Sequence, residues 1–299
     1  MVTAPPTGAS AETVKRPSWI FLGFWLTVLI LLYIIFREAA QNLYGTISRS
    51  NSYYSHSLLV PFVSAYFVWR ERQHLSQIPK NPTSWGYVVL ACACLMVLVG
   101  DLLGFRIFAQ AAIIPLSIGL SLSFLGVRHL RRMWFPIAFL AFMIPLPESL
   151  TTGLTFQLKM LATEAAVRLA QTFYLPMIHD GSYIHFGEDR LLVGDVCSGM
   201  RSLIALVALG AIMSALSETR VWSRILILLI SVPIAIVANV LRIFFLCVVA
   251  NFWGSAVASG RVHDISGPFI YVVAIGLMIG LEGVFRKIAP RNSRSAEVV

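Results

Sequence analysis

Long apolar runs, separated by short polar segments, make up most of the chain. A helix that crosses the hydrocarbon core of a membrane needs about 20 predominantly apolar residues. The pattern therefore predicts an all-α polytopic membrane protein with about eight transmembrane helices. The runs that predict them are residues 19–36, 57–70, 84–103, 106–126, 133–147, 200–217, 222–249 and 265–285.

One segment between the fifth and sixth runs has a different pattern. Residues 149–174 keep a helical period, with Leu150, Leu154, Leu158 and Leu161 on one side, but they also carry Lys159, Glu164 and Arg168. An apolar face combined with charges is typical of a helix that lies in the membrane interface. We expect an amphipathic interfacial helix here.

The next segment, residues 175–196, consists of short β-prone runs broken by turn-forming residues. Asp180-Gly181 separates two of these runs, and Asp-Gly between extended runs is a signal for a hairpin. We expect a small β-hairpin element that leads into the sixth apolar run.

Composition supports the membrane assignment and excludes nucleic acid as a partner. Of the residues, 58% are hydrophobic and only 12% are charged, whereas soluble domains carry about 25% charged residues. The net charge of +9 comes from small basic clusters between apolar runs. This distribution is typical of the cytoplasmic flanks of membrane spans, so the expected contact of these residues is with lipid.

The same basic clusters predict the orientation of the chain. With the N-terminus in the cytoplasm, most Lys and Arg residues fall in inside segments, as the positive-inside rule requires. We therefore expect both termini inside and five regions: a disordered tail (1–17), a five-helix membrane region (18–147), an extracytoplasmic segment (148–196), a three-helix catalytic region (197–287) and a basic tail (288–299).

The candidate chemistry centres on Cys197, between Gly194 and Gly199, just before the sixth apolar run. A helix that starts there directs unpaired N–H groups and its positive dipole end toward the thiol. This setting favours the thiolate, which is the nucleophilic form. The alternative is a small residue at an ordinary helix start.

Two further residues are predicted to lie at the depth of Cys197. At about 1.5 Å per helical residue, Arg242, Cys197 and His263 lie roughly 27, 31 and 34 Å from the inner ends of their spans. The hydrocarbon core is about 30 Å thick. Three adjacent spans therefore bring Cys, Arg and His to its outer boundary.

Such a set can perform nucleophilic acyl transfer. Cys197 would attack a peptide carbonyl, His263 would move the proton, and Arg242 would stabilise the oxyanion. Supporting roles fall to Arg201, Asn239 and Asp264. Alternatives remain for single residues: Arg242 can snorkel to lipid headgroups, Arg201 can anchor at the interface, His263 can be an ordinary loop residue, and Asp264 can cap a helix.

The other cysteines suggest no second site. Cys92 and Cys94 share one apolar run, and structural burial is the better interpretation of Cys247. No CxxC or Cys/His cluster is present, so the sequence supports neither a zinc site nor a disulfide framework. We expect no metal and no cofactor.

The chain resembles the exosortase/archaeosortase family of multi-pass membrane transpeptidases over about residues 50–286. The residues that match are Val196-Cys197-Ser198-Gly199-Met200-Arg201-Ser202, then Asn239-Val240-Leu241-Arg242-Ile243, and His263 before the last span. Two weaker features also match, His56-Ser57-Leu58-Leu59-Val60-Pro61 and Met143-Ile144-Pro145-Leu146-Pro147.

This resemblance implies a cysteine-type peptidase or transpeptidase with Cys197 as nucleophile and Arg242 and His263 as partners. The implied substrates are exported proteins with a C-terminal sorting signal, which combines a Pro-Glu-Pro-type motif, a transmembrane helix and a basic tail. The implied location is the bacterial inner membrane, with the site on the periplasmic side. The acceptor stays open between water and a lipid- or glycan-linked amine.

Two other classes of function remain open on the residues alone. One is a transporter or channel with a polar path near Arg242 and His263; Pro233 in the middle of its span favours this alternative. The other is a thiol oxidoreductase that uses Cys197 and Cys247. The clustering of ionisable residues at the outer edge, and the lack of CxxC, favour the transpeptidase.

Overall fold

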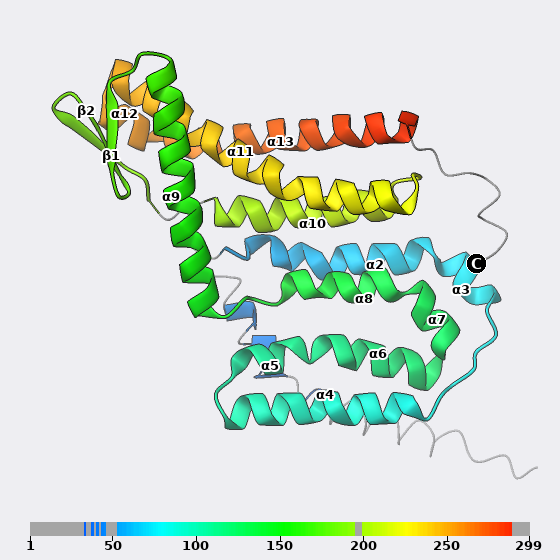
Figure 1. Ribbon diagram of the computed structural model, residues 1–299. Helices are drawn as coiled ribbons and strands as arrows, with labels where there is room; N and C mark the ends of the chain where they lie inside the picture. The colour runs from blue at the N-terminus through cyan, green and yellow to red at the C-terminus, as the bar shows by residue number, and fades with distance from the viewer. Residues whose placement is uncertain are drawn as a thin grey trace, which may run out of the picture.

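The computed structural model describes residues 53–194 and 199–288, together with scattered positions between 33 and 45. Within these ranges the chain is mostly helical, with one small sheet (Figure 1). The helices before the sheet are η1 (Ser55–Leu59), α2 (Val60–Arg70), α3 (Arg72–Gln77), α4 (Trp85–Leu102), α5 (Arg106–Ala111), α6 (Ile113–Phe124), α7 (Val127–Arg132), α8 (Trp134–Phe139), η2 (Leu140–Met143) and α9 (Glu148–Thr172). Strands β1 (Met177–Asp180), β2 (Tyr183–Phe186) and β3 (Asp189–Leu192) follow, and then α10 (Met200–Leu216), α11 (Val221–Trp253), α12 (Ser255–Ser259) and α13 (Arg261–Ile288).

The apolar helices run side by side as a bundle, and α9 crosses one end of it (Figure 1). The axis bends by 80° between the segment Trp134–Met143 and α9. The sheet and α12 lie at the same end as α9, whereas α3 and α7 lie at the opposite end (Figure 1). The bundle therefore has two distinct ends.

The number of spans is the part of the prediction that the structure does not confirm. Four helical segments are long and apolar enough to cross a membrane, namely Trp85–Leu102, Arg106–Phe124, Val221–Trp253 and Arg261–Ile288. A fifth is counted if the bent pair formed by Trp134–Met143 and α9 is one span. The chain is a multi-pass membrane protein with four to five candidate spans in the described ranges.

Local features of the chain explain why the structure has fewer candidate spans than the eight predicted. The run at 57–70 folds as a 3-10 turn followed by an 11-residue helix, and α10 has 17 residues. The run at 133–147 is divided into α8, a 3-10 turn and the proline-containing corner that follows. The first predicted span, 19–36, lies outside the described residues except for Tyr33. The predicted tails, 1–17 and 288–299, also lie outside them except for Ile288.

The segment predicted to be an amphipathic interfacial helix is a single helix, α9, with one exposed and one buried side. The charged residues Glu164 and Arg168 are exposed on it, together with three of the four predicted leucines. Leu150, Leu154 and Leu161 are exposed. The buried side carries small residues, Thr151, Thr155, Ala162, Thr163, Ala166, Val167 and Ala170. Small side chains allow helices to approach closely, so α9 packs against α11. Leu158, the fourth leucine of the predicted side, is partly buried where α9 meets α10 and α11.

The strands form a three-stranded antiparallel sheet in the order β1-β2-β3, which is one strand more than the expected hairpin. Gly181 and Gly187 lie in the two tight turns with φ of 57° and 59°, a conformation that glycine adopts without steric cost. The third strand forms because the run around Leu191 pairs with β2 and buries Leu191 against the same core as Ile184.

The sheet is attached to the end of α11. Met177, Ile184, Phe186, Leu191 and Val193 share a hydrophobic core with α9 and with the last turns of α11. A polar contact adds to it: the Asp189 carboxylate accepts a hydrogen bond of 3.1 Å from the backbone N–H of Ser255, the first residue of α12. Hydrogen bonds from Ser255 and Arg190 hold the pKa of this carboxyl below its usual range.

Helix α11 is the longest element, with 33 residues, and it continues through Pro233. It bends along its length (Figure 1), and a proline inside a helix is a sufficient cause, because it removes one hydrogen bond and displaces the preceding turn. At 1.5 Å per residue the helix is roughly 50 Å long, which exceeds the hydrocarbon core and leaves its last turns for the sheet.

Candidate active site

The N-terminus of α10 lies where the sequence predicts a helix to start. The helix begins at Met200, and the carbonyl of Gly199 accepts hydrogen bonds from the backbone N–H of Leu203 at 2.8 Å and from the Ser202 hydroxyl at 2.9 Å. Cys197 lies outside the described residues, as do its neighbours from Asp195 to Ser198. The described part of the motif is therefore its second half, from Gly199 into the first turn of α10.

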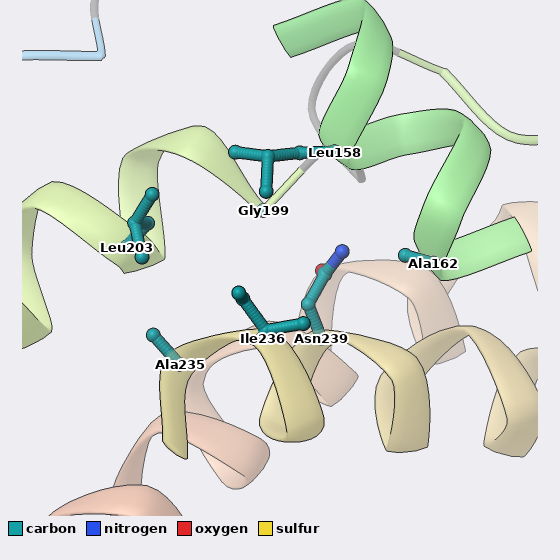
Figure 2. Close-up of a pocket in the computed structure, with 7 residues that line it drawn as sticks. All are labelled: Leu158, Ala162, Gly199, Leu203, Ala235, Ile236 and Asn239. Carbon is teal, nitrogen blue, oxygen red and sulfur yellow. The ribbon is translucent and has the colours of Figure 1, made fainter. Parts of the chain in front are cut away.

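Gly199 packs directly against Asn239 of α11. Its φ is +80°, and a Cβ atom at this position would lie 2.7 Å from Cγ and Nδ2 of Asn239. Figure 2 shows the Asn239 side chain rising from α11 between Gly199 and Ala162. The amide is 5% exposed. The motif thus requires a glycine here for two reasons, its backbone conformation and the space that Asn239 occupies.

A small hollow lies beside this contact, where α9, α10 and α11 meet (Figure 2). Its lining is apolar except for Asn239, and consists of Leu158, Ala162, Gly199, Leu203, Ala235, Ile236 and Asn239. On α11 the lining residues run from Ala235 to Asn239, which is about one helical turn.

Arg242 and His263 are brought together, as the depth estimate predicts. Nε of Arg242 donates to the Ser266 hydroxyl at 3.2 Å, and Nη2 donates to the backbone carbonyl of His263 at 3.3 Å. The Ser266 hydroxyl in turn donates to the same carbonyl at 2.8 Å. The guanidinium of α11 is therefore held against the first turns of α13.

No carboxylate pairs with Arg242 among the residues that the structure describes. Its hydrogen bonds in these ranges go to a hydroxyl and a carbonyl, which are neutral acceptors. A cation that is half-buried without a counter-charge attracts any anion that reaches it. Arg242 therefore has the electrostatic setting of an anion-binding group rather than that of a structural ion pair.

His263 lies in the first turn of α13, which corrects the expectation of a loop position. The helix begins at Arg261, directly after Gly260, which ends α12, so that His263 and Asp264 are both helical. Asp264 is therefore inside the first turn. One oxygen of its carboxylate lies 3.3 Å from His263 Nδ1. The side chain of Asp264 is 83% exposed, and exposed pairs contribute little to stability.

Arg201 is in the first turn of α10 and is half-buried. Its Nε atom is buried and makes no hydrogen bond within the described ranges. A cation at a helix N-terminus opposes the helix dipole, so helix stability gives no reason for an arginine here.

Sequence reasoning missed Ser266 and Gly267, which carry the contacts of Arg242 on α13. The available signal was spacing: His263, Ser266 and Gly267 stand at i, i+3 and i+4, which places them on one face of a helix. Extending the helix by one turn ahead of the apolar run would have exposed this pattern. Of the other cysteines, Cys247 is fully buried in the core of α9, α11 and the sheet, as expected.

The two weaker sequence features meet at one corner of the bundle. Leu146 donates its backbone N–H to Tyr54 Oη at 2.9 Å, and the Ser57 hydroxyl donates to the carbonyl of Phe142 at 3.2 Å. Between them, His56 has both ring nitrogens buried without hydrogen bonds in the described ranges, and burial lowers its pKa. The cluster around this corner includes Ile204 of α10, so it supports the helix that starts at the cysteine motif.

Comparison with known proteins gives one match. The model of a protein family described as "Transmembrane exosortase (Exosortase_EpsH)" matches residues 48–280. No curated protein and no solved structure matches the chain. The matched range covers the corner at His56 and every residue of the candidate site.

We predict that Gly199→Ala destabilises the protein by about 2 kcal/mol or more, since a residue with Cβ is strained at positive φ and the added carbon overlaps Asn239. Thermal unfolding in detergent measures the effect. Gly153→Ala, in α9, is the matched control, because nothing lies within 4 Å of its Cβ position. Adding Asn239→Ala to Gly199→Ala should recover part of the loss; no recovery would show that the two residues do not press on each other.

Proposed function

The chain belongs to the transmembrane exosortase family, and on this premise we propose that it is a membrane-embedded cysteine transpeptidase. It cleaves the C-terminal sorting signal of exported proteins through a thioester on Cys197. The contact between Arg242 and the first turn of α13 is the observation that carries the proposal. Within the described ranges Arg242 pairs with no carboxylate, and the contact joins it to the backbone carbonyl of His263, the histidine that matches the family motif.

The chemistry proceeds in two balanced steps. The Cys197 sulfur adds to the scissile carbonyl, the C–N bond breaks, and the proton of the thiol passes through His263 to the leaving amine. An amine or water then attacks the thioester and releases the thiol. Arg242 stabilises the oxyanion that forms in each step.

Covalent geometry limits how far Cys197 can lie from Gly199, which supports the proposal. Two Cα–Cα steps of 3.8 Å separate Cys197 from Gly199, so the two Cα atoms lie within about 7.6 Å of each other in any conformation of the chain. Gly199 contacts Asn239, and Arg242 is one helical turn further along α11. We propose that the Cys197 thiol, the Asn239 amide and the Arg242 guanidinium act on one carbonyl.

The supporting residues have distinct proposed roles. The proposed role of Asn239, which packs against Gly199, is to hold Arg242 or to hydrogen-bond the substrate. Asp264 can accept the Nδ1 proton of His263, which makes Nε2 the basic nitrogen of the ring. Arg201 adds positive charge at the start of α10, which favours the thiolate of Cys197.

The two ends of the bundle suggest its orientation in the inner membrane. Basic residues gather at the end opposite α9, on α3, on α7, at the start of α11 and at the end of α13 (Figure 1). The positive-inside rule puts that end in the cytoplasm. The sheet, α9 and the site then face the periplasm, and a substrate helix reaches the site laterally from the lipid, with water or a lipid- or glycan-linked amine as acceptor.

The alternatives are less well supported. A transporter site built on a discontinuous helix would need α11 to break at Pro233, but α11 continues through it as one helix. A thiol relay would need Cys247 to be accessible, but its side chain is 0% exposed.

Orientation can be tested by labelling single cysteines in a chain without its native cysteines. We predict that Glu188→Cys, in the turn between β2 and β3, reacts with a membrane-impermeant maleimide in intact spheroplasts. Gln77→Cys, at the end of α3, should react only after lysis. The reverse pattern would place the site in the cytoplasm and contradict the proposed location.

Cys197→Ser tests the nucleophile. We predict that it abolishes processing of a co-expressed substrate that carries a motif, a transmembrane helix and a basic tail, because serine lacks the acidity of the thiol. Immunoblotting of a tagged substrate measures the mature form, at equal enzyme levels. Cys247→Ser is the matched control and should process normally if it folds. Equal processing by wild type and Cys197→Ser would exclude the mechanism.

His263→Ala tests proton transfer. We predict that it slows thioester formation by about 100-fold, within the range for loss of a general base, while substrate binding stays nearly unchanged. Single-turnover acylation in nanodiscs separates the two quantities. An unchanged acylation rate would remove His263 from the chemistry and leave the nucleophile unaffected.

A further inference from the structure

Ser266 makes more contacts than a serine inside a helix usually makes. Its hydroxyl donates to the carbonyl of His263, three residues earlier, and this local bond is common for serines in helices. The same oxygen also accepts the Nε–H of Arg242 at 3.2 Å. The carbonyl of His263 accepts a hydrogen bond from Nη2 of the same guanidinium, so two oxygen atoms of α13 hold the Nε–Nη2 edge of one arginine.

Gly267 provides the surface beneath that arginine. A Cβ atom at this position would lie 3.3 Å from Nη2 and 3.4 Å from Cζ of Arg242. These distances are shorter than a comfortable carbon contact, so the guanidinium lies against the bare backbone of Gly267. A larger residue would have to displace it.

The face of α13 that carries these residues is fixed by packing. Ser266 is 3% exposed. Further along the same face, Ala274 and Met278 are buried in a core with Leu206, Ala235 and Ala238 of α10 and α11. Rotation of α13 would expose this core. Ser266 and Gly267, which we call the seat of Arg242, therefore stay turned toward the arginine.

We propose that Ser266, together with the bare backbone at Gly267, is a positioning site that orients Arg242 for the oxyanion. The inference rests on the proposed function. The bonds through Nε and Nη2 commit those donors to α13, while Nη1 makes no hydrogen bond in the described ranges. The N–H groups of Nη1 are the ones that meet the substrate. Long side chains lose conformational freedom when they bind, and the seat imposes that order before the substrate arrives.

The test is a double-mutant cycle between Ser266 and Arg242, read as single-turnover acylation of a fluorescent signal peptide by the full-length enzyme in nanodiscs. Ser266→Ala should slow acylation at saturating substrate by 10- to 100-fold and change KM by less than 3-fold. In an Arg242→Lys background the same change should cost less than 2-fold, because an ammonium has no Nε–H to anchor.

Ser231→Ala is the matched control. Ser231 is a fully buried serine on α11 that makes the same kind of local bond, to the carbonyl of Leu228 at 2.6 Å. It should change acylation by less than 2-fold. Ser266→Thr keeps the hydroxyl and should retain more activity than Ser266→Ala.

Three outcomes would overturn the proposal. Ser266→Ala could behave like Ser231→Ala, or its effect could be fully additive with Arg242→Lys, which would indicate a purely structural role. Alternatively, Arg242→Lys could acylate at the wild-type rate. This result would remove Arg242 from the mechanism, and Ser266 and Gly267 would then have no catalytic group to position. In the first two cases the proposed function stands, because Arg242 still contributes to the rate.

Discussion

A guanidinium at the edge of the hydrocarbon core needs hydrogen-bond acceptors, and α13 supplies them to Arg242. This interaction sets the relation between the two longest helices at the level where the chemistry is proposed. It requires α13 to begin early enough for the carbonyl of His263 to face α11. It also requires a small residue at Gly267, since any Cβ there would press on the guanidinium. The sequence around His263 satisfies these conditions together.

Helix α11 is the support that all parts of the site share. Its middle packs in one core with α10 and α13 through Ala235 and Ala238. Its last turns hold the sheet and α9 through Leu246, Cys247 and Ala250. Because α11, at roughly 50 Å, is longer than the hydrocarbon core is thick, it joins the membrane bundle to the end that carries α9 and the sheet. Asn239 and Arg242 lie between these two cores, so the packing on both sides fixes their positions.

Helical periodicity and turn chemistry account for most of what the sequence predicted. The start of α10 at Met200, the exposed leucines of α9 and the tight turns at Gly181 and Gly187 all follow from local rules. The common level of Arg242 and His263 follows from counting residues along helices, whereas their contact is seen only in the structure. Span number did not follow, because 3-10 turns and prolines divide runs that are uniformly apolar. Ser266 was missed because its role depends on which face α13 turns to α11, and apolar periodicity around it does not specify that.

Arg242 has no carboxylate partner within the described ranges. This distinguishes an arginine kept for the proposed catalysis from one kept only for structural stability. A buried or half-buried arginine kept only for structure would be more stable with an acidic partner, since removing a charge from water is costly. Neutral acceptors hold the side chain in place but leave its charge uncompensated. In the proposed mechanism, an oxyanion that forms during acyl transfer supplies the negative charge that the described residues do not provide. Because the charge appears only along the reaction path, the interaction is stronger in the transition state than in the ground state, which is the condition for lowering the barrier.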